Sequence, residues 1–221
     1  MSIATFGTGG AEPYAGALMR RSDVLYLRDT DAGSAHRVIM DVSRWNADAD
    51  TADLTLLASV LGPLLDIGCG PGRMVRAAQA LGLNALGLDV SSTAITLATS
   101  LGGAYIEGSV FDRVPGEGLW QTALLVDGNI GIGGDIPALL RRTRELLSAS
   151  GEIVVEVDRT PSHERHYLGE VVDAFGARSA TFPWAEIGRD RLIDLLPALR
   201  LRPVQTWDID GRSFCRLAKI E

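Results

Sequence analysis

The sequence has very little lysine and cysteine. Lys219 is the only lysine among the 221 residues, whereas arginine is plentiful. A mechanism that needs a lysine Schiff base is therefore excluded from the core of the chain. The two cysteines, Cys69 and Cys215, build neither a disulfide framework nor a metal site.

The sequence also lacks a basic surface and a long hydrophobic run. The formal net charge is −7, and the densest basic segment, Arg141-Arg142-Thr143-Arg144, falls within a predicted helix and is typical of a solvated face. Nucleic-acid binding requires a basic surface that displaces counterions, so we expect neither nucleic acid nor an anionic membrane as a partner. No apolar segment reaches the length of a membrane span, and residues 1–7 do not resemble a signal peptide. The sequence predicts a soluble, cytoplasmic protein.

Glycine is abundant, and it is most informative in the stretch from Leu64 to Arg73. An apolar run ending in an acid is followed by Gly68, Gly70 and Gly72, and an amphipathic helical pattern begins directly afterwards. A strand that turns at once into a helix needs backbone angles that only glycine adopts without strain. The free N–H groups of the first helical turn then face whatever lies above the loop. The stretch predicts a cofactor loop at the carboxyl end of a central strand.

The spacing of these glycines indicates which cofactor is bound. The dinucleotide fingerprint is Gly-x-Gly-x-x-Gly, but Arg73 stands where its third glycine is needed, and no Gly-Lys-Ser/Thr follows for a triphosphate. The pattern Asp-x-Gly-x-Gly-x-Gly resembles motif I of the class I S-adenosylmethionine-dependent methyltransferases. This resemblance implies S-adenosylmethionine as the cofactor, S-adenosylhomocysteine as the product and methyl transfer as the activity.

Strand and helix patterns alternate from Leu64 onward, which is typical of a parallel sheet. A hairpin signal at Asp210-Gly211 closes the chain. We predict an α/β fold with a doubly wound, mostly parallel seven-stranded sheet, the Rossmann-like methyltransferase fold, with a C-terminal antiparallel hairpin and an N-terminal cap. Residues 61–221 form the cofactor-binding core in this interpretation, and residues 1–60 form an arm, a hairpin and a cap helix that begins after Asp50.

The segment 160–187 exceeds what the bare fold requires. It contains two of the three histidines and the run Phe182-Pro183-Trp184. Two interpretations remain open, since such a segment either covers the acceptor pocket, as the resemblance implies, or forms an extra hairpin that extends the sheet.

The predicted cofactor residues follow the ends of successive strands. Asp89 lies 19 residues after Gly70, a separation that suits an acid bound to both ribose hydroxyls. By the resemblance, Asp66 faces the methionine end of the cofactor. The adenine contact falls to Ser109 or Asp112, because this chain lacks the Gly-Asp-Ala of many relatives, and Phe111 is either an adenine contact or ordinary core. The full predicted set is Asp66, Gly68, Cys69, Gly70, Gly72, Asp89, Val90, Ser109, Val110, Phe111, Asp127 and Gly128.

The catalytic group is less well defined. A general base is needed only where the acceptor atom carries a proton that must be removed, and the candidates are His163, His166, His36 and Asp127. Strand-end acids also allow a divalent metal at Asp127, Glu156 and Asp158, although we predict no metal.

The sequence thus predicts a methyltransferase that transfers a methyl group to O or N of a small molecule by in-line displacement. The alternatives are a non-catalytic module that binds the same cofactor and a nicotinamide oxidoreductase. The sequence favours no particular oligomeric state.

Overall fold

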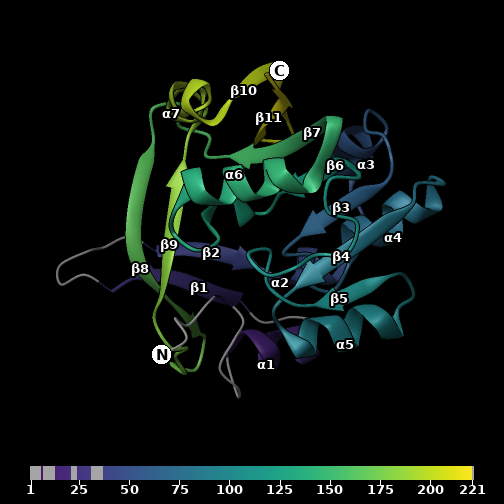
Figure 1. The fold of residues 1–221 in the computed structure, drawn as a ribbon. Coiled ribbons are helices and arrows are strands. Elements are labelled where there is room, and N and C mark those ends of the chain that lie inside the picture. The colour runs from purple at the N-terminus through teal and green to yellow at the C-terminus, as the bar shows by residue number, and fades with distance from the viewer. Residues whose placement is uncertain (1–5, 7–12, 21–23, 31–36, 221) are drawn as a thin grey trace.

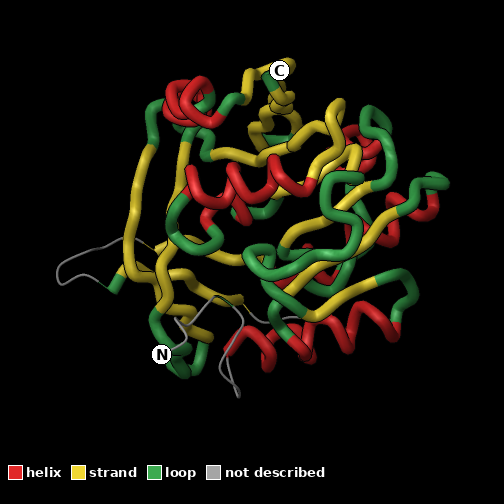
Figure 2. The backbone as a smooth tube through the Cα atoms, in the orientation of Figure 1, coloured by secondary structure: helices red, strands yellow, loops and turns green. Residues whose placement is uncertain are grey.

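The computed structural model describes residues 6, 13–20, 24–30 and 37–220. Seven strands form the main sheet, and four more form a second, smaller sheet (Figures 1 and 2). The helices and strands of the core are β3 (Leu64–Ile67), α4 (Arg73–Ala80), β4 (Ala85–Asp89), α5 (Ser92–Ser100), β5 (Tyr105–Glu107), β6 (Trp120–Leu125), η1 (Asn129–Gly131), α6 (Ile136–Leu146), β7 (Leu147–Val157), α7 (Arg189–Leu195), η2 (Pro197–Leu199), β10 (Leu201–Ile209) and β11 (Arg212–Lys219).

The main sheet has the strand order β10-β11-β7-β6-β3-β4-β5. The five strands from β7 to β5 are parallel, and β11 is antiparallel to both of its neighbours. The predicted fold class is confirmed, including the C-terminal hairpin. Positive φ angles at Asp210 and Gly211 make the tight turn of that hairpin.

Helices cover both faces of this sheet because successive strand residues point in opposite directions. Leu65 packs in one hydrophobic cluster with Leu139 of α6. Its neighbour Leu64 belongs to another cluster, together with Val75 of α4 and Leu56 of α3 (Thr51–Leu57). Apolar residues in consecutive positions of β3 are therefore both buried, as in a strand covered on two sides.

The leader forms a hairpin of β1 (Val24–Asp29) and β2 (Arg37–Asp41), as predicted. Val42, expected in the second strand, instead begins the short helix α2 (Val42–Asn46), because the Asp41 side chain caps it by accepting a hydrogen bond from Arg44 N at 3.1 Å. Asp50 caps α3 as predicted, in a reciprocal capping box with Asp53.

The segment 160–187 contributes β8 (Glu164–Asp173) and β9 (Phe182–Ile187), which form a hairpin. This hairpin does not extend the main sheet. Strand β8 pairs with β1, and the second sheet has the order β2-β1-β8-β9. In Figure 1, β8 and β9 run from the neighbourhood of α7 to β1 and β2, so two segments far apart in the sequence build one layer. Helix α1 (Pro13–Arg20) packs on this sheet, where Leu18 lies in a cluster with Leu25 and Phe182.

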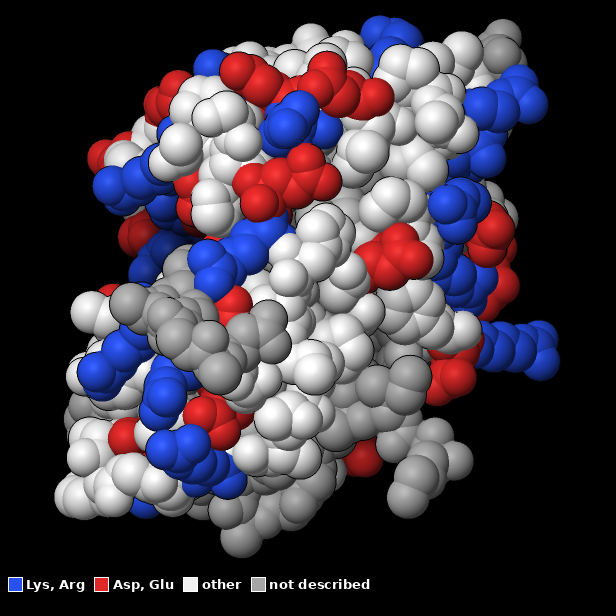
Figure 3. All heavy atoms as spheres, turned by 90° about the vertical axis from the view of Figure 1, so that its left-hand side faces the viewer, with Lys and Arg blue, Asp and Glu red and all other residues white. Residues whose placement is uncertain are grey.

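The surface carries both signs of charge. On the face that contains β8, basic and acidic side chains are interspersed (Figure 3). Within the ranges that the structure describes, no helix is long and apolar enough to cross a membrane.

Candidate functional site

A pocket of about 1000 Å³, its open mouth included, lies at the carboxyl ends of the parallel strands. It is lined by the glycine loop after β3, the end of β4, and the loops after β5 and β6. Ligands of open α/β sheets bind at this edge. The predicted cofactor residues on the pocket wall are Asp66, Gly68, Cys69, Gly70, Asp89, Val90, Ser109, Val110, Phe111 and Asp127.

Gly72 and Gly128, the other two predicted residues, lie beside the pocket rather than on its wall. Both have positive φ angles, 84° and 86°. Gly72 precedes the first residue of α4, and a Cβ atom at this position would collide with the ring of Tyr105. Gly128 precedes η1. Their places in the structure are those of backbone residues that shape the two loops.

Asp89 fixes the glycine loop to the end of β4. Its Oδ2 accepts a hydrogen bond from Gly70 N at 2.8 Å, and its Oδ1 accepts one from Ser91 N at 2.8 Å. Burial raises the pKa of Asp89, and backbone N–H groups, including those two, oppose the rise. Each carboxylate oxygen retains a second lone pair that can accept a hydrogen bond from a hydroxyl in the pocket.

Asp66 has an unpartnered oxygen in the pocket wall. The residue is 1% exposed, and its Oδ1 has no hydrogen-bond partner among the residues the structure describes. Burial raises its pKa to about 8, and the nearby carboxylates of Asp127 and Asp89 add to the rise. A buried carboxylate without a partner is costly. A ligand ammonium is the chemical group that would remove this cost.

The two candidate adenine contacts, Ser109 and Asp112, differ in their position relative to the pocket. Ser109 lies on the pocket wall, and its Oγ accepts a hydrogen bond from Phe111 N at 3.2 Å. Asp112 is exposed and does not line the pocket, and its carbonyl accepts a hydrogen bond from Arg142 at 2.6 Å. Phe111 is 44% exposed and is therefore not a core residue.

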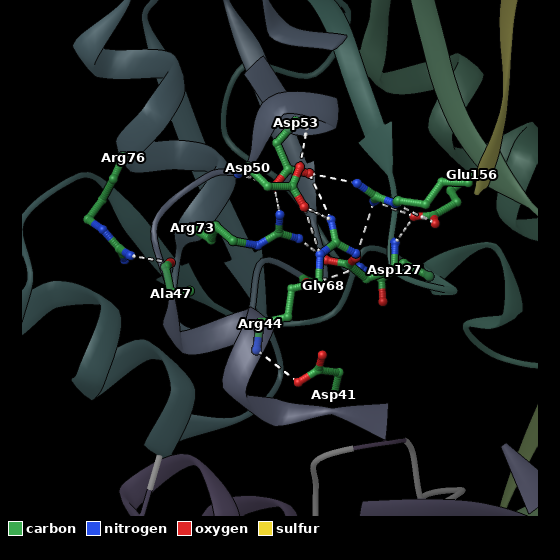
Figure 4. A network of polar contacts seen from close by, with 12 residues as sticks. Asp41, Arg44, Ala47, Asp50, Asp53, Gly68, Arg73, Arg76, Asp127 and Glu156 are labelled. Atoms are coloured by element: carbon green, nitrogen blue, oxygen red, sulfur yellow. Dashed lines mark hydrogen bonds and ion pairs between the residues drawn. The ribbon is translucent and has the colours of Figure 1, made fainter. Parts of the chain in front are cut away.

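Asp127 lies on the pocket wall, and its carboxylate is held by arginines (Figure 4). One oxygen accepts hydrogen bonds from Arg44 at 3.2 Å and from Arg212 at 3.3 Å, and the other pairs with Arg73. The backbone N–H of Asp127 donates to Glu156 Oε2 at 2.6 Å, and its φ is 55°. These contacts hold the loop after β6 in a left-handed turn that a non-glycine residue rarely adopts.

The same arginines converge on Asp53 of α3, which is completely buried. Asp53 Oδ1 accepts from Arg212 at 2.8 Å and from Arg44 at 3.2 Å, and Oδ2 pairs with Arg73. The cluster joins α2, α3, α4 and β11 beneath the pocket. The sequence did not reveal this cluster, and its only signal was the unusual arginine at position 73.

The candidate histidines lie outside the pocket wall. His163 Nε2 is 2.9 Å from Glu186 Oε2, and His166 Nδ1 is 3.0 Å from the carbonyl oxygen of Gly134. His36 lies outside the described residues. Of the candidate bases that the structure describes, only Asp127 reaches the pocket. Glu156, one of the acids considered for a metal site, binds Arg212 at 2.6 Å.

An aromatic wall completes the pocket, and the sequence did not reveal it. It comes from the second sheet and from the helices next to it, whereas the residues predicted to bind the cofactor come from the core. Trp184, on β9, had only been noted as part of the segment 160–187. The wall consists of Phe6, Tyr14, Met40, Trp45 and Trp184.

Comparisons with known proteins agree with this geometry. Residues 65–117 match a family model described as a methyltransferase domain. No curated protein sequence matches the chain. A methyltransferase from Bacteroides fragilis, solved with S-adenosylhomocysteine, superposes with a TM-score of 0.78 at 17% identity over 98% of this chain and 99% of that chain.

Two further structures align with lower scores. The 1,6-didemethyltoxoflavin-N1-methyltransferase of Burkholderia thailandensis, solved with 1,6-didemethyltoxoflavin and S-adenosylhomocysteine, gives a TM-score of 0.59 at 19% identity over 99% of this chain and 95% of that chain. The sugar N-methyltransferase KedS8 from Streptoalloteichus gives 0.57 at 14% identity over 77% and 86%.

Residues 65–117 are similar to a methyltransferase domain, and the chain has the fold of the class I S-adenosylmethionine-dependent methyltransferases. The cofactor of this class is S-adenosylmethionine, and its product is S-adenosylhomocysteine.

Proposed function

We propose that the chain transfers the methyl group of S-adenosylmethionine to a nitrogen or oxygen atom of a small molecule by in-line displacement. The observation that carries the proposal is the unpartnered Asp66 carboxylate, which lies in the same pocket as the glycine loop and Asp89. Two acids on the wall of one pocket suit the ribose hydroxyls and the ammonium of an adenosyl amino acid. The small-molecule acceptor is supported by two structural neighbours, the 1,6-didemethyltoxoflavin-N1-methyltransferase and the sugar N-methyltransferase.

In this proposal, different residues of the pocket bind different parts of the cofactor. Asp89 accepts hydrogen bonds from the ribose hydroxyls while the N–H groups of Gly70 and Ser91 hold its side chain in place. Asp66 accepts a hydrogen bond from the ammonium of the methionine part. Val110 and Phe111 contact the adenine ring, and Ser109 supplies a polar contact beside it. The bound sulfonium supplies an activated methyl group with a good leaving group, and holding the acceptor in line lowers the barrier by about 7–11 kcal/mol in favourable cases.

A cytoplasmic location and a small-molecule rather than nucleic-acid partner belong to the same proposal. The net charge of −7 and the mixed charges on the face of Figure 3 support a partner other than nucleic acid.

Isothermal titration calorimetry with S-adenosylhomocysteine tests the proposed function. We expect micromolar binding, and we expect titration with NADH to give no heat of binding. Incubation with S-adenosylmethionine and a panel of small amines and alcohols is then expected to yield a methylated product. Cofactor binding without any product would favour the non-catalytic module, and no binding of S-adenosylhomocysteine at high micromolar concentration would refute the proposal.

Cofactor binding is expected to release a proton from Asp66. Its pKa of about 8 lies above the ordinary value of 3.8, so most of this carboxyl is protonated at pH 6–7 in the free protein. A bound ammonium favours the carboxylate, so the affinity for S-adenosylhomocysteine should increase by about tenfold per pH unit between pH 6 and pH 8. Calorimetry in buffers of different ionisation enthalpy measures the released proton.

The matched control for this experiment is Asp66→Asn, which cannot release a proton. Its weaker binding should show no such pH dependence. A wild-type affinity that is constant from pH 6 to pH 8 would contradict the role given to Asp66.

A further inference from the structure

The part of the pocket that the cofactor residues do not cover has walls of a different origin. Met40 comes from β2, Trp45 from α2, Tyr14 from α1 and Trp184 from β9. None of these elements belongs to the main sheet or to the helices that cover it. The pocket wall is therefore made partly by the core and partly by the second sheet with α1 and α2, and the Tyr14 hydroxyl lies next to Gly70 of the glycine loop.

The aromatic rings of this part of the pocket wall pack at defined angles. Tyr14 and Trp45 meet edge to face, with ring centroids 5.9 Å apart and planes at 70°. Trp184 meets Phe182 in the same way at 5.8 Å and 81°, and it is only 5% exposed. Trp45 is partly exposed and offers ring surface to a guest, whereas Tyr14 and Trp184 are buried and contribute only small parts of their rings to the pocket wall. A flat aromatic guest makes the best use of such surfaces, because it can stack on a face or meet an edge.

The charged side chains of the pocket wall are two acids assigned to the cofactor and one ion pair. Arg73 and Asp127 pair with each other, and Asp66 and Asp89 are the two acids assigned to the cofactor. A charged acceptor that binds in the pocket loses its hydration, and no charged side chain of the described wall is left to act as its counter-charge. A protonated amine suits an aromatic surface, but it has no lone pair with which to take a methyl group.

The other ionisable groups of the pocket wall are either protonated or bound to other side chains. Burial raises the pKa of the Tyr14 hydroxyl and of the Cys69 thiol well above their usual values, so both stay protonated. The carboxylate of Asp127 is bound by three arginines. An alcohol needs a group that removes its proton, whereas a neutral nitrogen brings its own lone pair.

We propose that the acceptor is a flat, uncharged aromatic molecule that is methylated on a nitrogen atom. This inference rests on the proposed function. The nitrogen lone pair forms the new bond to the methyl carbon, and the bond from carbon to sulfur breaks with its electron pair left on sulfur. The positive charge passes to the nitrogen, which then loses a proton to water.

Three probes of similar size separate the parts of this proposal. They are 1-aminonaphthalene, 1-naphthol and 1-decalol, all uncharged at neutral pH, and the last is not flat. With the S-adenosylhomocysteine complex we expect the two aromatic probes to bind at least about tenfold more tightly than 1-decalol. With S-adenosylmethionine, we expect 1-aminonaphthalene to be methylated at least about tenfold faster than 1-naphthol.

Each contrary result overturns the proposal. Equal or tighter binding of 1-decalol would refute the flat acceptor, and faster methylation of 1-naphthol would refute the nitrogen. Absence of binding by both aromatic probes at millimolar concentration would refute the aromatic site. If S-adenosylhomocysteine itself binds in the same preparation, the proposed function survives each of these results, so the two failures are distinguishable.

The variant Trp45→Leu tests the wall itself, with Trp207→Leu as the matched control. Trp207 stacks on Phe214 in the C-terminal hairpin, with ring centroids 5.2 Å apart, and it does not line the pocket. We expect Trp45→Leu to weaken binding of 1-aminonaphthalene at least about fivefold, with the affinity for S-adenosylhomocysteine changed less than about twofold. Trp207→Leu should change neither. Unchanged binding of the probe by Trp45→Leu would contradict the proposal.

Discussion

Replacement of Asp89 by alanine is expected to weaken the binding of S-adenosylhomocysteine by at least about 100-fold. Two hydrogen bonds from ribose hydroxyls to a carboxylate contribute about 1.5–3 kcal/mol each, and alanine removes both. The change also releases Gly70 N and Ser91 N, which Asp89 binds at 2.8 Å each. The glycine loop then loses its attachment to β4, so the loss of affinity should exceed that of the ribose contacts alone. Calorimetry measures the affinity.

Asp112→Ala is the matched control for this experiment. Asp112 lies in the next loop along the chain and is exposed, but its side chain does not line the pocket. We expect its affinity to remain within about twofold of the wild type, because an exposed carboxylate outside a site has little effect on binding. Circular dichroism checks that Asp89→Ala remains folded. A folded Asp89→Ala protein with unchanged affinity would refute the assignment of Asp89 to the ribose.

The fold was predictable from the sequence where the signals are local. The strand ending at Ile67, the glycines after it and the cap at Asp50 each act within a few residues, and the structure confirms the elements that they predict. Turn chemistry at Asp210-Gly211 likewise identified the C-terminal hairpin. Such features follow from backbone sterics and from unpaired N–H groups, which do not depend on distant parts of the chain.

The second sheet was not predictable in the same way. The leader hairpin was predicted, and a hairpin was one of two interpretations of the segment 160–187. Neither predicted the pairing of β1 with β8, which brings Leu27 opposite Val171. An alternating apolar pattern shows that one face of a strand is buried, and it does not identify the partner strand. The aromatic wall depends on this pairing, since Trp184 reaches the pocket only when β9 is held beside β8. The part of the pocket wall that comes from the second sheet was therefore not predictable from the sequence. The residues predicted to bind the cofactor come from the core.

The cluster of charges beneath the pocket was hidden for another reason. Charged residues such as Asp53 and Arg212 are ordinarily assigned to the surface, because burial of an isolated charge is costly. Here the charges are buried together, and Asp53 is completely enclosed. No spacing rule links positions 53, 73 and 212, because they meet only after the main sheet and its C-terminal hairpin have formed.

The replacement Asp53→Asn is expected to reduce the free energy of unfolding by about 3–5 kcal/mol, because it leaves buried arginines without their counter-charge. Arg212 binds Asp53 at 2.8 Å, and the side chain of Arg73 is 3% exposed. Burial lowers the pKa of Arg73, and Asp127 opposes this change. The asparagine keeps the shape of the side chain but replaces one accepting oxygen by an NH2 group, so the loss includes the charge and the hydrogen bonds to that oxygen. Urea denaturation measures it.

Two further variants show whether the lost charge is the cause. Asp190→Asn removes a carboxylate that is 61% exposed and 3.6 Å from Arg189, and it should change the free energy of unfolding by less than about 0.5 kcal/mol. The double replacement Asp53→Asn with Arg73→Met removes a buried positive charge together with its partner, so it should recover at least about half of the loss. A loss below about 1 kcal/mol in Asp53→Asn, or a double variant less stable than the single one, would show that the cluster does not hold α3, α4 and the C-terminal hairpin together. Because Asp127 belongs to the same cluster, the loop that borders the pocket depends on the same balance of charges.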